Sequence, residues 1–307
     1  MNEIIRPHET EIQPQESRFG NRERITEILR DGEIVDIVRI EDIYPELSVH
    51  ENIVEVANIK PAKHKNINEI LGIRIQKGKD VLQAIFKPAN GESAEVKNQT
   101  AIHDFYPHEC AAFIVSDHFG FDIVPPTIIR DIEGEGIGAL QLFLDHNFYQ
   151  MSSTLNSQGW REAMAGQDHA KIALLDWILA NCDRRQENIL VSNDDPTQMV
   201  GIDHGIILST FDYYSPAIEL RGPSLVRTYD NQKQCAKHIP IQSELIDLLK
   251  SGYERKNELT DQLKQLPDIK EEEIELMWRR ASYLISLREY LSKANFTKEK
   301  LLEGTDV

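Results

Sequence analysis

The sequence predicts an α+β fold with two lobes. Residues 46–145 are rich in strand-like segments, whereas the pattern from about residue 146 is mostly helical. Strand-rich and helix-rich halves in succession are typical of α+β proteins, and the cleft between two lobes is a common ligand site. We therefore divide the 307 residues into an N-terminal tail with an accessory helix (1–45), a strand-rich lobe (46–145) and a helical lobe (146–307).

The first half contains two predicted helices among several strands. Ile25, Ile28 and Leu29 recur at helical spacing, and Gly32 follows as a stop signal. Pro107 suits the first turn of a second helix that ends near Gly120. Apolar runs bounded by turn residues predict strands or extended segments at 32–40, 52–57, 71–76, 81–86, 123–129 and 137–144.

The second half is predicted to be helical around two short strands. A helix over 168–182 leads into a polar loop, and short apolar runs follow it at 189–191 and 200–202. Further helices are expected at 241–264 and 268–292, and residues 1–20 are expected to form a loose tail.

Composition describes an ordinary globular protein with an acidic surface. Hydrophobic residues at 40% and charged residues at 28% allow a substantial core. The net charge of −17 gives no general attraction toward nucleic acid or an anionic membrane, because Lys and Arg supply that attraction. We therefore expect no nucleic-acid partner.

Cysteine use and hydropathy indicate a cytoplasmic location. Cys110, Cys182 and Cys235 form no C-x-x-C pair, so we expect buried thiols rather than disulfides or a metal site. The first residues lack the apolar region of a secretory signal. No stretch approaches the roughly 20 apolar residues of a membrane span, so no integral membrane segment is expected.

Polar loops in the second half have a spacing suited to phosphoryl transfer. Asp183 follows an apolar segment, Asn188 comes five residues later, and Asp203 ends a second apolar run. One carboxylate can position an acceptor hydroxyl, while the amide and the second carboxylate hold magnesium on the phosphates. Asp and Asn also fill ordinary turns, so the spacing alone leaves that alternative open.

Two charged residues of the first half are candidates for the same site. Lys87 ends an apolar strand, from which it can reach the phosphates of ATP or remain a solvated lysine. Glu109 lies in the first turn of a helix, where the helix dipole favours an acidic residue in any case. Its functional interpretation is an ion pair that fixes Lys87.

Several segments between about residues 80 and 230 carry a family resemblance. They are Ala84-Ile-Phe-Lys-Pro-Ala-Asn-Gly-Glu92, His108-Glu-Cys-Ala-Ala-Phe113, Phe121-Asp-Ile-Val-Pro-Pro-Thr-Ile128, Gly138-Ala-Leu-Gln-Leu-Phe-Leu144, Asp183-Arg-Arg-Gln-Glu-Asn188 and Ile202-Asp-His-Gly205. In this order they resemble the phosphatidylinositol 3-/4-kinase-like branch of the protein-kinase fold. The resemblance is strongest to type II phosphatidylinositol 4-kinases and small bacterial relatives, and HipA-like kinases are also similar.

The resemblance implies a kinase that uses ATP and Mg²⁺ to phosphorylate a hydroxyl. It assigns Lys87 to the ATP phosphates with Glu109 as its partner, and Asp183 as the catalytic base. It assigns Asn188 and Asp203 to magnesium. Adenine would meet a hinge formed by Gln141, Leu142, Phe143 and Leu144.

The chain also departs from the family pattern. The loop from Lys60 to Glu69 has no glycine for a phosphate cradle, and Lys63 or Lys65 is a candidate to supply charge instead. His204 stands where the family has Phe or Asn, and we interpret it as a packed or hydrogen-bonded side chain rather than a titrating group. The cysteine-rich lipidation segment of type II lipid kinases is absent from the sequence.

The acceptor is left open by the sequence. A lipid, a protein or a small molecule fits the motifs, and a HipA-like Ser/Thr protein kinase is an alternative. Other kinase-like folds transfer AMP or glutamate. A nucleotide-binding pseudokinase that acts as a scaffold is the alternative from a different class, supported only by the missing glycine loop.

Overall fold

The computed structural model describes residues 17–39, 70–100, 102–145, 148–181, 183–208 and 243–293. The predicted strand 52–57, the loop with Lys63 and Lys65, and the cysteines Cys182 and Cys235 lie outside these ranges. Cys110 is a buried free thiol, as predicted. None of the helices within the described ranges has the length and apolar character needed to cross a bilayer.

The first lobe is built on a five-stranded antiparallel sheet with the strand order β1-β2-β3-β5-β4. Its strands are β1 (Glu33–Arg39), β2 (Leu71–Lys77), β3 (Asp80–Pro88), β4 (Thr127–Ile132) and β5 (Gly136–Leu142). The helices of this lobe are α1 (Arg22–Asp31), the short η3 (Ala89–Gly91), α3 (Ala94–Thr100) and α4 (Tyr106–His118). The predicted helices and described strands of this half are therefore confirmed, except that β4 begins at Thr127 rather than at residue 123 and continues to Ile132.

Helix α1 is fixed onto this sheet at its C-terminal end. Ile28 and Leu29 are buried in the same apolar cluster as Ile75 and Phe86 of the sheet. Arg130 of β4 donates hydrogen bonds to the carbonyls of Leu29 and Gly32, both at 2.6 Å, which satisfies acceptors that a helix end leaves open. A side chain at Gly32 would collide with Ile75 and the Ile28 carbonyl, so only glycine allows this close approach.

The sheet shows that the predicted boundary at residue 45 is wrong. Strand β1 pairs with β2 from Glu33 opposite Gln76 to Arg39 opposite Leu71, with a shift of register between Ile34 and Asp36. The segment assigned to a tail and accessory helix thus supplies one strand of the first lobe and a helix that covers it. The apolar residues in 33–39 were compatible with a strand, but the partner of that strand was not identifiable from local pattern.

The second lobe surrounds a small sheet with the order β6-β7-β8. These strands are β6 (Tyr149–Met151), β7 (Ile189–Ser192) and β8 (Met199–Gly201), so the two predicted strands gain a third. Around them lie η4 (Ser152–Thr154), α5 (Ser157–Ala163), α6 (Gln167–Leu179) and η5 (Gln186–Asn188). The fold is α+β and two-lobed, as predicted.

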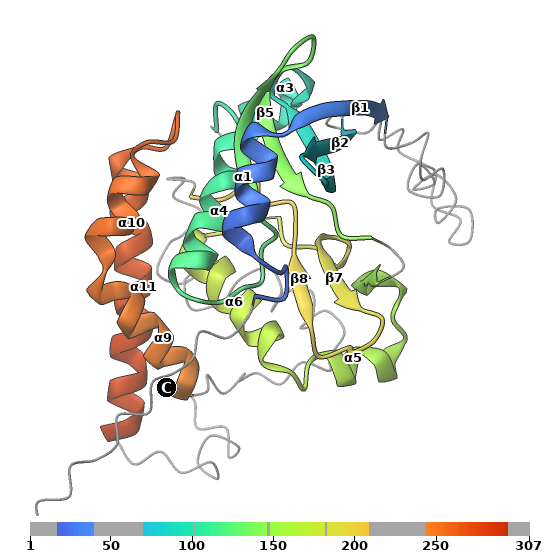
Figure 1. Cartoon of the computed structure of the whole chain (residues 1–307). Coiled ribbons are helices and arrows are strands. Elements are labelled where there is room, and N and C mark those ends of the chain that lie inside the picture. Colours follow the sequence, from blue (N-terminus) through green and yellow to red (C-terminus); the bar gives the residue numbers. More distant parts are fainter. Residues whose placement is uncertain are drawn as a thin grey trace, which may run out of the picture.

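Three further helices form a layer beside both lobes. They are α9 (Ser243–Glu254), α10 (Lys256–Leu263) and α11 (Glu271–Lys293), drawn in orange and red at one side of the molecule (Figure 1). Helix α10 contacts α4, and α11 contacts α6. Their apolar residues Leu249, Leu263 and Met277 belong to the same core as Phe119 and Leu175. This core therefore joins the helices of the two lobes.

Residues 17–19 fasten α1 to the second lobe. The guanidinium of Arg18 donates to both carboxylate oxygens of Asp168 in α6, at 2.6 and 3.0 Å, and to the carbonyl of Met199 in β8 at 3.0 Å. Ser17 donates to Asp122 at 2.8 Å, and Phe19 is buried in the core. The predicted loose tail over 1–20 is therefore wrong for these three residues, because a buried ion pair and an aromatic anchor hold them.

Replacing Arg18 by Met should destabilise the protein strongly. Asp168 is buried, and loss of its bidentate partner leaves the carboxylate only with Lys171, at 3.2 Å, and the backbone N–H of Met199, so the free energy of unfolding should fall by about 1–3 kcal/mol. Urea unfolding measures this loss. Arg24→Met is the matched control, because Arg24 pairs with Asp80 and Glu27 at the exposed surface and its loss should change stability far less. Equal effects of the two substitutions would contradict the role given to Arg18.

Candidate active site

Lys87 lies at the end of β3 with its ammonium group between two carboxylates. The Nζ atom is 2.5 Å from Oε1 of Glu109 and 2.9 Å from Oδ1 of Asp203. The neighbouring strand reaches Lys87 closely because it carries glycine there: a side chain at Gly138 would meet the Lys87 carbonyl and the Phe86 ring. The sequence thus brings a cation to a buried strand end and surrounds it with acidic partners.

Glu109 reaches Lys87 from the first turn of α4. Its side chain is only 3% exposed, and its second oxygen, Oε2, accepts a hydrogen bond from the backbone N–H of His204 at 3.0 Å. The start of α4 is itself held by Glu92, whose carboxylate accepts from the backbone N–H groups of Phe105 and Tyr106. Both oxygens of Glu109 are therefore occupied, and the helix that carries it is capped.

The electrostatics of the cluster favour the charged states of Lys87 and Asp203, whereas burial raises the pKa of Glu109. Burial by itself lowers the pKa of Lys87, but the carboxylates of Asp203 and Glu109 outweigh burial and raise that pKa above its ordinary value. The charge of Lys87 also lowers the pKa of Asp203 to about 2. Lys87 is therefore a cation and Asp203 an anion at neutral pH.

The loop that carries Asp183 begins where α6 ends. Ala180 adopts a left-handed conformation with φ of 53°, which turns the chain out of the helix. The Asn181 side chain donates to Asp176 at 2.9 Å and accepts from the backbone N–H of Asp183 at 2.9 Å. The loop thus leaves the helix in one fixed direction.

Arg184 organises this loop from inside the protein. Its side chain is fully buried and binds the Asp176 carboxylate through Nε at 2.9 Å and a terminal nitrogen at 3.0 Å. The other terminal nitrogen donates to the carbonyls of Asn188 at 2.7 Å and Ile202 at 2.8 Å. One guanidinium therefore fixes the backbone beside both predicted magnesium ligands.

The polar ends of Asp183, Asn188 and Asp203 are available for ligands. Asp183 is 38% exposed in its side chain, and burial of the rest raises its pKa while Arg185, at 3.4 Å, opposes the shift. Asn188 donates through its amide nitrogen to the Asp183 carbonyl at 3.1 Å, which leaves its amide oxygen for a cation. Asp203 is 39% exposed and has a left-handed φ of 58° directly after β8.

The oxygen atoms of this group fit a magnesium ion. Carboxylate and amide oxygens are suitable ligands for a hard cation, and Asp203 is ionised. The backbone N–H of Ile202 donates to the Asn188 carbonyl at 3.0 Å, so the two candidate ligands lie on neighbouring, hydrogen-bonded segments. The structure thus brings all five predicted polar residues to one place.

The predicted hinge lies where β5 leaves the first lobe. Gln141 is buried and donates to Thr127 at 2.8 Å, so its side chain is held within the sheet. Leu142 and Phe143 donate through their backbone N–H groups to Pro126 and Gln83. Leu142 and Leu144 pack against an apolar cluster that includes Ala84 of the first lobe and Val200 of the second.

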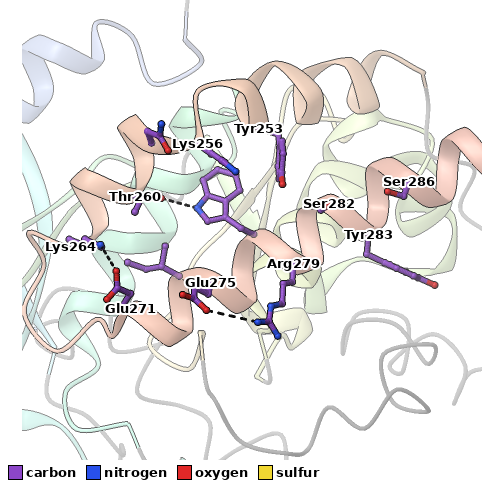
Figure 2. A pocket seen from close by; sticks show the side chains of 13 residues that line it. Tyr253, Lys256, Thr260, Lys264, Glu271, Glu275, Arg279, Ser282, Tyr283 and Ser286 are labelled. Carbon is purple, nitrogen blue, oxygen red and sulfur yellow. Dashed lines mark hydrogen bonds and ion pairs between the residues drawn. The ribbon is translucent and has the colours of Figure 1, made fainter.

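A surface groove elsewhere lacks this chemistry. It has a volume of about 630 Å³ and runs along α10 and α11, where Tyr253, Trp278 and Tyr283 contribute aromatic rings (Figure 2). Lys264 and Glu271 form an ion pair of 2.6 Å beside it. None of the predicted site residues lines the groove, so it is separate from the candidate active site.

Comparison with known proteins supports the resemblance found in the sequence. A family model described as phosphatidylinositol 3- and 4-kinase matches residues 76–223, which include Lys87, Glu109, Asp183, Asn188 and Asp203. Residues 76–223 are therefore similar to the phosphatidylinositol 3- and 4-kinases. The kinase-like match begins within β2 and continues beyond β8.

Two curated relatives are similar to part of this chain. Phosphatidylinositol 4-kinase gamma 4 of Oryza sativa subsp. japonica is 32% identical over 209 residues, covering 55% of this chain and 35% of that protein. Protein Rv2133c of Mycobacterium tuberculosis is 27% identical over 165 residues, covering 41% of this chain and 54% of that protein. The chain thus spans less than two thirds of either curated relative.

A solved structure shows a more distant likeness. The Helicobacter pylori proinflammatory kinase CtkA is 14% identical with a TM-score of 0.40, covering 75% of this chain and 91% of that chain.

Sequence reasoning singled out candidate ligand residues but not the residues that position them. Arg184, Asp176 and Asn181 were not singled out, although all three are buried and hydrogen-bonded to one another or to the loop. A detectable signal was Asp176 itself, a charged residue inside the apolar run Leu174-Leu-Asp-Trp-Ile-Leu179. A buried carboxylate requires a partner, and the next cations along the chain are Arg184 and Arg185.

Replacing Lys87 by Met should raise the pKa of Asp203 from about 2 toward the ordinary value of about 4. Because the folded-state pKa is lowered, the ion pair stabilises the protein above about pH 4, and this contribution disappears as the pH falls toward 2. The Lys87→Met variant should lose this part of the dependence of the free energy of unfolding on pH. Carboxyl-carbon NMR titration and urea unfolding at several pH values measure both effects.

Lys97→Met serves as the control for this measurement. Lys97 pairs with Glu92 and Asp104 rather than with Asp203. Its replacement should leave the Asp203 pKa unchanged. If Lys87→Met also left that pKa near 2, the electrostatic coupling between Lys87 and Asp203 would be refuted.

Proposed function

We propose that the protein is a kinase that uses ATP and Mg²⁺ to transfer the γ-phosphate to a hydroxyl. The observation that carries the proposal is the position of Lys87, held by Glu109 and Asp203 beside the loop of Asp183 and Asn188. Phosphoryl transfer depends mainly on positioning and charge neutralisation, and this arrangement offers fixed charges of both signs. The match to phosphatidylinositol 3- and 4-kinases supports the same conclusion.

Lys87 would bind the α- and β-phosphates, with Glu109 holding its side chain in place. Asn188 and Asp203 would hold magnesium, which neutralises charge on the phosphates when bound. Before the nucleotide binds, Lys87 and Asp203 neutralise each other in an ion pair of 2.9 Å. Phosphate and metal would then take up the charges that these side chains now offer to each other.

Asp183 would orient the acceptor hydroxyl and accept its proton. Its raised pKa makes the carboxylate a better base than an ordinary exposed aspartate. Arg185, at 3.4 Å and 60% exposed, adds positive charge beside it and is directed toward solvent rather than buried like Arg184. A positive charge at this position would favour the approach of the phosphate oxygens.

Adenine would lie beside Gln141, Leu142, Phe143 and Leu144. The apolar cluster at this point combines Ala84 and Leu142 with Leu190 and Ile202, so apolar side chains of both lobes would contact a flat ring bound here. Within the described residues, no hydrogen bond involves the backbone of Leu144, whereas those of Leu142 and Phe143 are engaged. Leu144 is therefore the proposed backbone partner of the adenine edge.

Replacing Asp203 by Asn should lower γ-phosphate transfer by about 10²- to 10³-fold, because one charged ligand of the metal is lost. Transfer from γ-labelled ATP to the protein itself, to inositide vesicles and to cell extract, run in parallel, measures the loss and identifies the acceptor. Asp194→Asn is the matched control, since Asp194 is exposed in the turn between β7 and β8. An unchanged rate in the Asp203 variant would refute the proposal.

The product of this assay separates the proposed reaction from related ones. Mass spectrometry distinguishes an added phosphate from AMP or glutamate by the added mass. A lipid product would agree with the name of the rice relative, phosphatidylinositol 4-kinase, and a modified protein would favour the HipA-like alternative.

ATP with magnesium should stabilise the folded protein. A ligand that binds only the native state at 100 times its Kd adds about 2.7 kcal/mol to the free energy of unfolding. A thermal-shift measurement should therefore show a higher Tm with ATP and magnesium than with ATP and a chelator. Absence of any shift would favour a scaffold that binds no nucleotide. Stabilisation without transfer in the parallel assay would instead favour a nucleotide-binding pseudokinase.

A further inference from the structure

His204 connects α4 to the Asp183 loop through two hydrogen bonds at opposite ends of the residue. Its backbone N–H donates to Glu109 Oε2 at 3.0 Å. Its ring nitrogen Nε2 lies 2.7 Å from a terminal nitrogen of Arg184. The residue is completely buried, so no water competes for these contacts.

The chemistry of this contact fixes the state of the ring. Arg184 has only donors, so Nε2 of His204 must accept and the ring proton must reside on Nδ1. Burial, together with the charge of Arg184, holds the pKa of His204 well below its ordinary value, which keeps the ring neutral. Nδ1 is buried and has no hydrogen-bond partner among the described residues.

A histidine is a costly choice at this position if packing is its only role. A buried donor without a partner destabilises a protein, and an apolar ring of similar size carries no such donor. What histidine offers that an apolar ring does not is an acceptor for Arg184. This guanidinium in turn holds the backbone carbonyls of Asn188 and Ile202.

We propose that His204 is a positioning residue that couples the Lys87–Glu109 pair to the Asp183 loop. Through its backbone it fixes one carboxylate oxygen of Glu109, and through its ring it fixes Arg184. The residues that would bind phosphate and those that would bind metal and acceptor are thereby kept in one arrangement. The inference rests on the proposed kinase function, which it deepens by naming a residue that touches neither nucleotide nor acceptor.

Replacing His204 by Phe should lower kcat by about 10- to 100-fold, the range found when the supporting partner of a site residue is lost. The affinity for ATP should change much less, because Lys87 and the residues proposed to contact adenine remain. His204→Gln should regain most of kcat, since its side-chain oxygen can accept from Arg184. The measurements are kcat and the dissociation constant of ATP, with Tm as a check on folding.

His118→Phe provides the matched control. His118 is another buried histidine, at the far end of α4 from Glu109, and its Nε2 contacts the Gly252 carbonyl at 2.8 Å. This variant should lose thermal stability but keep kcat. The inference is overturned if His204→Phe retains the kcat of the unmodified protein, or if His204→Gln is as impaired as His204→Phe.

A second measurement is independent of catalysis. Glu109→Gln and Arg184→Lys lie on the two elements that His204 joins, so their effects on the free energy of unfolding should be non-additive. The same pair should become additive when His204 is Phe. Equal non-additivity in both backgrounds would refute the coupling even if the protein transferred no phosphate. If the unmodified protein is inactive while the coupling is found, the proposed function fails and the structural link stands.

Discussion

The arrangement of the site depends on one partly buried cation. Lys87 is 18% exposed and forms ion pairs with Glu109 and Asp203. The three residues come from different elements: Lys87 from the end of β3, Glu109 from the first turn of α4 and Asp203 from the segment after β8. A buried charge is costly unless it is paired, so these elements must meet in one geometry. Several local features serve that geometry, namely glycine at position 138, the Glu92 cap of α4 and the left-handed backbone of Asp203.

A second network, centred on the guanidinium of Arg184, does the same for the loop that carries Asp183 and Asn188. Arg184 binds Asp176 from α6 and the carbonyls that flank the candidate metal ligands. The Lys87 network includes partly exposed side chains that a ligand would contact, whereas Arg184 and Asp176 are fully enclosed. Lys87 and Asp203 would therefore exchange partners during a reaction cycle, whereas Arg184 and Asp176 would hold the backbone of the loop in place. His204 contacts both networks.

Periodicity and turn residues predicted most of the elements, because helices such as α1 and strands such as β3 have strong local patterns. They did not predict β6, which has three residues and depends on pairing with β7. Spacing and resemblance together predicted Lys87, Glu109, Asp183, Asn188 and Asp203, all of which the fold brings together. The positioning contacts were not accessible in this way: Arg18 and Asp168 are 150 positions apart, and nothing near either residue identifies its partner.

The layer formed by α9, α10 and α11 sets the extent of the folding unit. The stretch that matches the kinase family, 76–223, contains neither these helices nor α1 and β1. Yet Leu245, Leu249 and Met277 complete the core around Phe119, and β1 covers one edge of the large sheet. Cutting the chain to the matched stretch would uncover apolar surface on α4 and α6 and open a strand edge, both of which promote aggregation. The folded unit is therefore larger than the stretch that matches the family model.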